Sequence, residues 1–202
     1  MKKLLLISCI FVSIQGYAQN KFTPELLWKL GRVSEAKISP DGKSILYGIT
    51  YYNLKENKGN RDIYIISIDG GSPEKLTDTK ESEYNAIWRP DGKKIGYLSS
   101  KSGSMQLWEM NPDGSGKKQI TEIDEGVTGF NYSPKADKIL YTKDVKMDST
   151  LLDIYPDLPK TNAMLFDDLM YRHWDSWTDY SYSHIFFSLF SLTASGKSAT
   201  DT

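Results

Sequence analysis

Three stretches of the chain share one pattern of apolar and polar positions. They read ISPDGKSILYGIT (38–50), IWRPDGKKIGYLSS (87–100) and FNYSPKADKILYT (130–142). In each, a proline-containing turn, in which proline presets φ and glycine accepts a positive φ, precedes apolar residues at every second position. A period of two is typical of a half-buried strand, so each stretch is predicted to form a turn that leads into a strand. The third stretch has Ala136-Asp137 in place of Asp-Gly, and its turn is expected to differ.

The similarity between the three units continues downstream of each strand. There each unit has a strand-like run, a turn rich in glycine or serine, and a short second run that ends in an apolar residue and threonine. These segments are residues 62–78, 106–122 and 184–202. Each unit is therefore predicted to contain four strands.

The spacing of the units predicts how the sheets are arranged. Pro40, Pro90 and Pro134 lie 50 and 44 residues apart, close to the period of β-propeller blades. Compared with the second unit, the third unit has 34 additional residues before its third strand, which indicates an insertion at about 143–181. The sequence therefore predicts an all-β fold, a partial β-propeller of about three four-stranded blades with a short N-terminal helix and an insertion in the third blade. The expected boundaries are 19–35 for the lead-in segment and 36–79, 84–123 and 127–202 for the blades.

The first 18 residues have the composition of a secretory signal peptide. Lys2 and Lys3 precede an apolar run of 11 residues (4–14), and Gly16-Tyr17-Ala18 places small residues where a signal peptidase reads. The apolar run is shorter than the roughly 20 residues that cross a bilayer. We therefore expect cleavage after Ala18, export to the periplasm or medium of a Gram-negative bacterium, and no membrane span in the mature chain. The alternative is a lipoprotein, because LISC, which ends at Cys9, loosely fits a lipoprotein box.

Composition and charge exclude several classes of function. The net charge of the 202 residues is −1, so the chain has no electrostatic footprint for nucleic acid. Cys9, the only cysteine, lies in the expected signal peptide, so the mature chain would have no disulfide, cysteine-bound zinc or thiol nucleophile. The aspartates that recur at the turns are spaced too widely for a calcium loop; they are Asp41, Asp69, Asp91 and Asp113. No cofactor and no metal is expected.

Several turns and segments resemble those of known propeller proteins. The turns SPDG, IDGG and NPDGSG resemble the repeats of the prolyl-oligopeptidase family of serine peptidases, with its dipeptidyl-peptidases and acylaminoacyl-peptidases, and those of TolB-like periplasmic propellers. Two segments favour the peptidases. LMYRHWDSWTDYSYSHIFF (169–187) is similar to a segment between strands of an early blade in bacterial members, and FTPELLWKLGRVSEAKISPDG (22–42) is similar to their lead-in to the first blade.

The resemblance implies a propeller of seven or eight blades that caps an α/β-hydrolase domain, whose catalytic Ser lies in a G-x-S-x-G turn. No G-x-S-x-G occurs in the sequence, so no catalytic residue is expected in it. We interpret the chain as the N-terminal propeller fragment of an exported serine peptidase, which gates the access of short peptides to a C-terminal hydrolase domain absent from these residues. That domain and the peptides are the expected partners. The alternative is a non-enzymatic TolB-like periplasmic propeller that binds protein partners.

The expected insertion carries the candidate contact residues. An aromatic cluster there, which also includes Tyr182, suits a substrate entrance or a contact with the hydrolase domain. The candidates are Tyr171, Arg172, His173, Trp174, Trp177 and Tyr180. The alternative is that they pack the insertion onto its blade. His173 and His184 have serines and aspartates near in sequence, but a catalytic triad takes residues from separate loops, so structural roles are expected. Dipeptidyl peptidases hold the substrate amino group with paired glutamates, and no Glu-Glu pair occurs here.

Overall fold

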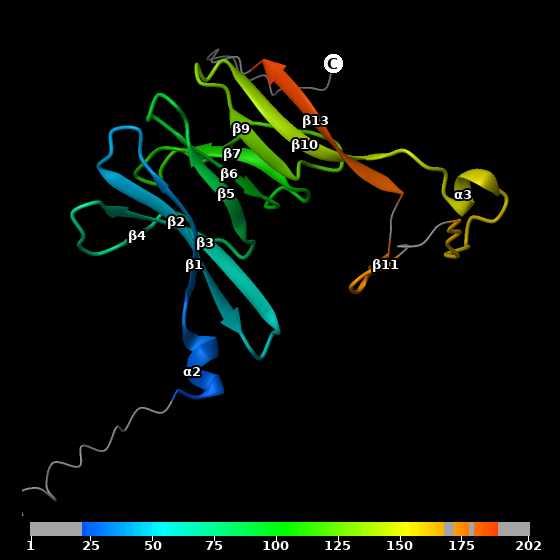
Figure 1. The fold of residues 1–202 in the computed structure, drawn as a ribbon, viewed down its shortest axis with the longest axis horizontal. Coiled ribbons are helices and arrows are strands. Elements are labelled where there is room, and N and C mark those ends of the chain that lie inside the picture. Colours follow the sequence, from blue (N-terminus) through cyan, green and yellow to red (C-terminus); the bar gives the residue numbers. More distant parts are fainter. Residues whose placement is uncertain (1–21, 168–171, 178–179, 190–202) are drawn as a thin grey trace, which may run out of the picture.

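The chain forms three successive antiparallel sheets (Figure 1); the first two are meanders of strands that are neighbours in sequence, and the third is interrupted by an insertion. The computed structural model describes residues 22–167, 172–177 and 180–189. The first sheet contains β1 (Arg32–Ile38), β2 (Ser44–Asn53), β3 (Lys58–Ser67) and β4 (Glu74–Lys75). The second contains β5 (Glu83–Trp88), β6 (Ile95–Ser99), β7 (Gln106–Met110) and β8 (Lys118–Gln119). The third contains β9 (Gly129–Tyr132), β10 (Lys138–Lys146) and β13 (Ser181–Leu189), and its expected fourth strand falls outside the described residues.

The three proline turns follow one backbone path. In each, an amide N–H donates to the carbonyl three residues earlier at 2.8–2.9 Å. The donor residues Gly42, Gly92 and Ala136 all have a positive φ, of 72°, 69° and 53°. The expectation that the third turn differs is therefore wrong for the backbone, because Ala136 takes the left-handed conformation that costs a non-glycine residue about 1–2 kcal/mol. Only the side chains differ, since Ser133 donates to Asp137 there (2.6 Å).

Equivalent strand positions can be assigned from the cross-strand register. The residue seven positions after each proline is a tyrosine, and it pairs with an aromatic residue of the third strand. The pairs are Tyr47–Tyr64, Tyr97–Trp108 and Tyr141–Phe186. In the first and third sheets the two rings stack, with centroids 6.0 and 5.4 Å apart. We call the face with these aromatic pairs the front face of each sheet, and the opposite face its back face.

The core lies between the sheets, where the back face of one sheet packs on the front face of the next. In the first interface Leu46 and Ile63 of the first sheet pack with Ile95 and Tyr97 of the second. In the second interface Leu98 and Leu107 of the second sheet pack with residues of the third, which are Phe130, Tyr132, Ile139 and Tyr141. This repeated stacking confirms the predicted all-β, partial-propeller fold. No helix within the described residues is both long and apolar enough to cross a membrane.

The first strands of the three sheets are linked in series through two bulges. β1 and β5 are each interrupted at the same position of the repeat, where Glu35 and Asn85 have φ values of 56° and 50°. A carboxylate oxygen of Glu35 accepts a hydrogen bond from the Asn85 N–H (2.9 Å), and the Asn85 side-chain amide donates to the Phe130 carbonyl oxygen (3.1 Å). Each bulge thus ties its sheet to the next one.

A short helix precedes the first sheet. α2 (Pro24–Lys29) begins after Thr23, whose side-chain oxygen accepts a hydrogen bond from the Leu26 N–H (3.2 Å). Proline at the first helical position is favourable because its missing N–H would have had no partner there. The Trp28 ring of α2 contacts the Tyr52 ring edge-on, with centroids 5.5 Å apart, and the Arg32 guanidinium lies over both rings. The helix therefore lies against the outer end of the β2–β3 hairpin.

The insertion leaves the third sheet between β10 and β13. These strands pair along their whole length, from Lys138 with Leu189 to Lys146 with Ser181. We call residues 147–180 the insertion arm. It contains the one-turn helix α3 (Leu151–Ile154), with a capping box of Thr150 and Asp153, and the small hairpin of β11 (Arg172–His173) and β12 (Ser176–Trp177). Figure 1 shows α3 and β11 well away from the three sheets.

Candidate functional site

The predicted contact residues lie around the β11–β12 hairpin of the insertion arm. Arg172 and Trp177 face each other across its two strands, with the Arg172 guanidinium 5.2 Å from the centre of the Trp177 ring. Trp174 lies in the connecting turn with a φ of 55°, and its side chain is 88% exposed. Tyr171 and the His173 side chain lie outside the described residues.

Trp177 and Tyr180 are brought together by Phe166, which sequence reasoning did not single out. The Phe166 ring lies nearly parallel to both rings, with centroids 5.9 Å from each. The Tyr180 hydroxyl donates to the Leu165 carbonyl oxygen (2.9 Å) and accepts from the Leu165 N–H (3.0 Å). These contacts build a small aromatic core within the arm. Trp174 is the more exposed of the two tryptophans of the hairpin, at 88% against 50% for Trp177, which stacks on Phe166.

His184 is held by a backbone hydrogen bond. Its Nδ1 lies 2.8 Å from the carbonyl oxygen of Tyr182, so this nitrogen donates to the backbone. The Tyr182 hydroxyl donates to Asp148 (2.8 Å), a contact that raises the pKa of the phenol. A nucleophilic site would instead need a serine hydroxyl and a carboxylate on the two sides of the ring. Among the residues described, no three His, Cys, Asp or Glu side chains converge as metal ligands would.

Two hollows lie on the first two sheets. One, of about 450 Å³, is formed where the proline turns of these sheets meet, and its lining includes Asp41, Ile65, Trp88 and Asp91. Both carboxylates are already engaged, Asp41 by the Ser39 hydroxyl (2.6 Å) and Asp91 by Arg89. The other, of about 610 Å³, lies beside the β2–β3 hairpin. Neither hollow is lined by the predicted contact residues.

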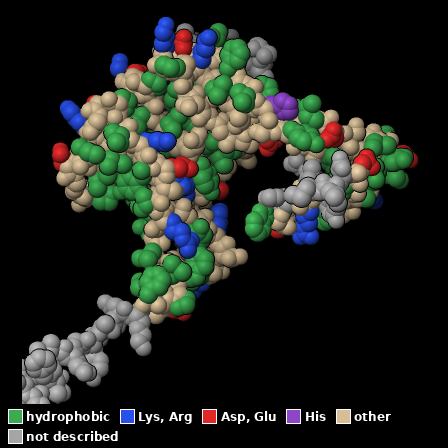
Figure 2. All heavy atoms as spheres, in the orientation of Figure 1, with side chains coloured by type: hydrophobic (Ala, Val, Ile, Leu, Met, Phe, Trp, Pro, Cys, Tyr) green, Lys and Arg blue, Asp and Glu red, His purple; other side chains and the backbone are tan. Residues whose placement is uncertain are grey.

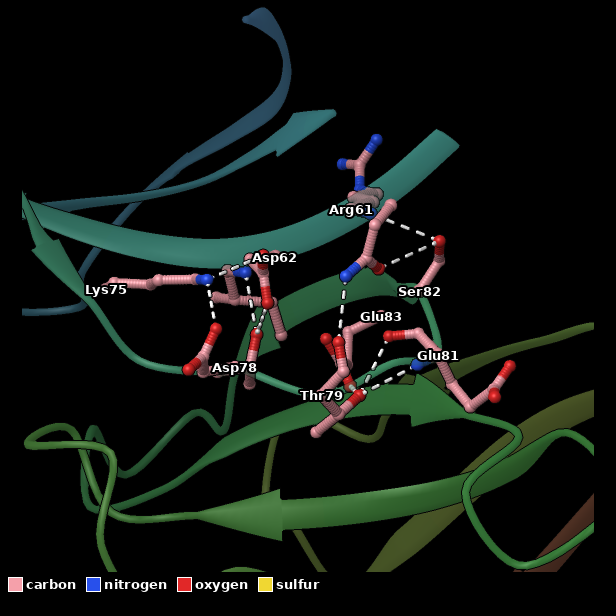
Figure 3. A network of polar contacts seen from close by, with 11 residues as sticks. Arg61, Asp62, Lys75, Asp78, Thr79, Glu81, Ser82 and Glu83 are labelled. Atoms are coloured by element: carbon pink, nitrogen blue, oxygen red, sulfur yellow. Dashed lines mark hydrogen bonds and ion pairs between the residues drawn. The ribbon is translucent and has the colours of Figure 1, made fainter. Parts of the chain in front are cut away.

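A polar network lies along the connection between the first and second sheets (Figure 3). Lys75 is 3.0 Å from the buried Asp62 carboxylate and also pairs with Asp78, whose pKa this contact lowers. Next to it, the Thr79 hydroxyl donates to one oxygen of Glu83 (2.6 Å). Glu83 is only 1% exposed, and burial raises the pKa of its carboxyl group against the effect of that hydrogen bond.

The raised pKa of Glu83 predicts a pH dependence of stability. The Glu83 carboxyl group binds its proton more tightly in the native state than in the unfolded state, where the pKa of a glutamate is about 4.3. The free energy of unfolding therefore falls as the pH rises from about 4.3 to the native pKa of this group, because the native state must then give up the proton. Glu83→Gln should remove this loss, and the free energy of unfolding should therefore rise relative to wild type between pH 4 and pH 7. Urea unfolding at each pH measures it. The control is Glu81→Gln, a change at a half-exposed neighbour, which should leave the pH dependence of the unfolding free energy as in wild type. If Glu83→Gln also left this pH dependence unchanged, Glu83 would not be its source.

A buried ion pair of the second sheet is hydrogen-bonded to the third sheet. The Arg89 guanidinium binds Asp91 through two contacts of 2.9 Å and lies 3.3 Å from the Glu109 carboxylate. Tyr132 of β9 donates its hydroxyl proton to the same carboxylate (2.7 Å). Burial, together with the Glu109 charge, raises the pKa of Tyr132, so the phenol stays protonated and donates. Sequence analysis missed this contact. Its one signal was Arg89 itself, which stands where the other two units have Ser39 and Ser133.

Comparison with known proteins agrees with the fold and the predicted resemblance. The family model described as TolB beta propeller domain matches residues 30–168. The dipeptidyl-peptidase 5 of Porphyromonas gingivalis is 45% identical over 157 residues, which are 78% of this chain and 23% of that protein. The dipeptidyl-peptidase 5 of Porphyromonas endodontalis is 36% identical over 165 residues, 82% of this chain and 24% of the relative. The chain thus spans about a quarter of the length of these curated relatives.

Among solved structures, the acylaminoacyl peptidase of Pyrococcus horikoshii superposes with a TM-score of 0.63 at 16% identity. The match covers 85% of this chain and 25% of that one. At this identity the likeness concerns the fold alone. Together with the relatives above, it confirms the predicted resemblance to peptidase propellers with TolB-like repeats.

Proposed function

Because the chain belongs to the TolB β-propeller domain family, we propose that it is the N-terminal propeller part of an exported serine peptidase that acts on short peptides. The observation that carries this proposal is the 45% identity to a protein named dipeptidyl-peptidase 5 over most of the chain. In this proposal the catalytic residues lie in a hydrolase domain outside these 202 residues. The sheets described here form part of the wall of the propeller channel through which short peptides reach that domain.

The insertion arm has the features of a contact element for the catalytic domain or the peptide. A tryptophan at a hairpin tip offers a large, rigid surface at low cost in conformational entropy, and such residues often dominate the affinity of interfaces. Trp174 adopts a positive φ that is costly for a bulky residue and remains 88% exposed. The stacking of Phe166 on Trp177 and Tyr180 gives its hairpin a firm base. We therefore assign the contact role to Trp174 and a supporting role to Trp177 and Tyr180.

The test compares the 202-residue chain with the product of the whole reading frame that encodes it. The whole product should release a fluorophore from dipeptidyl-coumarin substrates, react with a fluorophosphonate probe, and begin near Gln19 when it is isolated from the cell envelope. The 202-residue chain should neither cleave the dipeptidyl-coumarin substrates nor react with the probe, because it has no G-x-S-x-G serine. Export of a whole product that neither cleaves nor reacts would favour the alternative, a TolB-like propeller that binds proteins.

The same assay tests the insertion arm. In the whole product, Trp174→Ala should lower kcat/KM by about tenfold, which corresponds to 1.4 kcal/mol of lost interaction, with no change in the melting temperature. The control is Leu54→Ala, a change at an exposed apolar residue in the β2–β3 turn. Equal effects of the two substitutions would show that the arm has no special role.

A further inference from the structure

The hollow of about 450 Å³ between the first two sheets is lined by residues of both sheets and of their proline turns. β1 begins just after α2 and ends at its proline turn, so the hollow lies at the end of the sheets opposite α2 (Figure 1). The surface at this end carries basic and acidic side chains together (Figure 2). It has no charge of a single sign, so any preference for a ligand must come from the hollow itself.

The equivalent place between the second and third sheets is filled by an arginine. Arg89 corresponds to Ser39, because both precede the proline of their turn and both N–H groups donate to the carbonyl oxygen five residues later, at 2.8–2.9 Å. The Arg89 guanidinium binds both oxygens of Asp91 at 2.9 Å. In the first turn these two positions hold Ser39 and Asp41. The first interface therefore keeps the aspartate of this ion pair and lacks its guanidinium.

Asp41 is held in the orientation that Asp91 has beside its arginine. In each turn the carboxylate oxygen Oδ1 accepts a hydrogen bond from the N–H two residues later, at 3.1 and 3.0 Å. The Oδ1 of Asp41 also accepts from the Ser39 hydroxyl (2.6 Å), which replaces the Nε–H of Arg89. Its Oδ2 corresponds to the oxygen that binds Arg89 Nη2, and it bonds to no other side chain among the described residues. One acceptor of a bidentate arginine site is therefore available.

The other lining residues suit a flat cation. Trp88 stands where the third sheet has Tyr132, and Ile65 stands where the second sheet has a glutamate. An indole ring attracts a cation to its face, and a guanidinium group also stacks on it. The chain holds Arg32 in this way, with its guanidinium 4.8 Å from the centre of the Trp28 ring. The hollow thus combines a carboxylate with an aromatic wall.

We propose that this hollow binds the guanidinium group of an arginine side chain of another polypeptide, in the place that Arg89 fills in the next interface. The guanidinium donates to the Asp41 carboxylate and stacks on Trp88. A lysine is the poorer ligand, because its ammonium group neither matches a carboxylate with two parallel hydrogen bonds nor stacks as a plane. The site is separate from the insertion arm, and it goes beyond the proposed peptidase function.

The test titrates N-acetyl-arginine amide into the 202-residue chain labelled with 5-fluorotryptophan, which has five tryptophans to follow by fluorine NMR. The Trp88 signal, identified by its loss in Trp88→Phe, should shift with a dissociation constant of about 1 mM, as the usual affinity per ligand atom predicts. N-acetyl-citrulline amide, the neutral isostere, should bind at least about tenfold more weakly. N-acetyl-lysine amide should also bind at least about tenfold more weakly.

Three variants locate the site. Asp41→Asn should weaken the binding of the arginine compound at least about tenfold, because it removes the charge of the acceptor. The matched control is Asp69→Asn, in a turn of the same sheet that does not line the hollow, and it should bind as wild type does. Ser39→Arg should abolish binding, since its own guanidinium would pair with Asp41 as Arg89 pairs with Asp91. Circular dichroism checks that each variant is folded, and Asp41→Asn decides if Ser39→Arg is not.

Each other outcome overturns the proposal. An unshifted Trp88 signal excludes the site, equal binding of the citrulline or lysine compound excludes recognition of a guanidinium, and full binding by Asp41→Asn or by folded Ser39→Arg places it elsewhere. The whole product of the reading frame should bind the arginine compound as well. Its failure to bind would show that its other residues already occupy the hollow, which excludes a separate partner. No step requires peptidase activity, so failure leaves the proposed function untouched.

Discussion

Replacing Arg89 with methionine should lower the free energy of unfolding by about 3–5 kcal/mol, the usual cost of removing one partner from a buried ion pair. Glu109 would keep only the hydroxyl of Tyr132, in a place where its side chain is 7% exposed. A carboxylate in that position has neither water nor a cation to stabilise its charge. Urea unfolding at pH 7, monitored by tryptophan fluorescence, measures the loss.

The matched control removes both charges. The double variant Arg89→Met with Glu109→Leu should recover most of the lost stability, because replacing a whole buried ion pair with apolar residues is often neutral or stabilising. Tyr132→Phe alone should cost about 1.5–3 kcal/mol, since it removes one hydrogen bond to a charged group. If the double variant were as unstable as Arg89→Met, the loss would come from packing of the arginine side chain and the electrostatic explanation would be wrong.

Truncation of Leu107 to alanine should lower the free energy of unfolding by about 2–5 kcal/mol, because the substitution leaves a cavity in a packed core. Leu107 is at the centre of the second interface, between the back face of the second sheet and Phe130, Ile139 and Tyr141 of the third. Thermal unfolding with and without the substitution measures the effect. The melting temperature should fall by several degrees, as expected for a domain of this size.

Ile185→Ala is the matched control, because it changes the equivalent position in the third sheet. In a dilute solution of monomers it should change the stability by no more than about 0.5 kcal/mol, as exposed substitutions do. A large loss in dilute monomer would show that Ile185 is already buried within the chain, and that the back face of the third sheet is not open.

The architecture could be predicted from the sequence because its signals are local. A proline turn, a period of two and a repeat of 44–50 residues lie within short windows, and they are independent of how one sheet packs on another. The turn around Ala136 shows the limit of such reasoning. Because alanine replaces glycine at position 136, the sequence predicted a different turn. In the structure Ala136 nevertheless has the conformation that glycine has in the other two units.

The contacts between sheets could not be predicted in the same way. Glu83 and Glu109 read as ordinary charged residues of a strand, and only the packing of the neighbouring sheet makes them buried. The role of Phe166 was equally hidden, because it meets Trp177 and Tyr180 through the fold of the arm. The departure of Arg89 from serine in the repeat was visible, but its partner Glu109 lies 20 residues further along the chain, and Tyr132, which donates to Glu109, lies further still. Sequence periodicity locates the strands, and side-chain partners across sheets require the three-dimensional structure.

The meander order has a consequence for how the chain folds as it is synthesised. Every pairing in the first two sheets joins strands that are neighbours in sequence, so the first sheet is complete once Lys75 is available and the second once Gln119 is. The third sheet is different, because β10 must wait for β13 across the whole insertion arm. Closing that loop costs more entropy than closing a short hairpin, and contacts between distant residues form slowly. The nascent chain should therefore gain its structure in two stages, with two early blades that act as a template for a late third one.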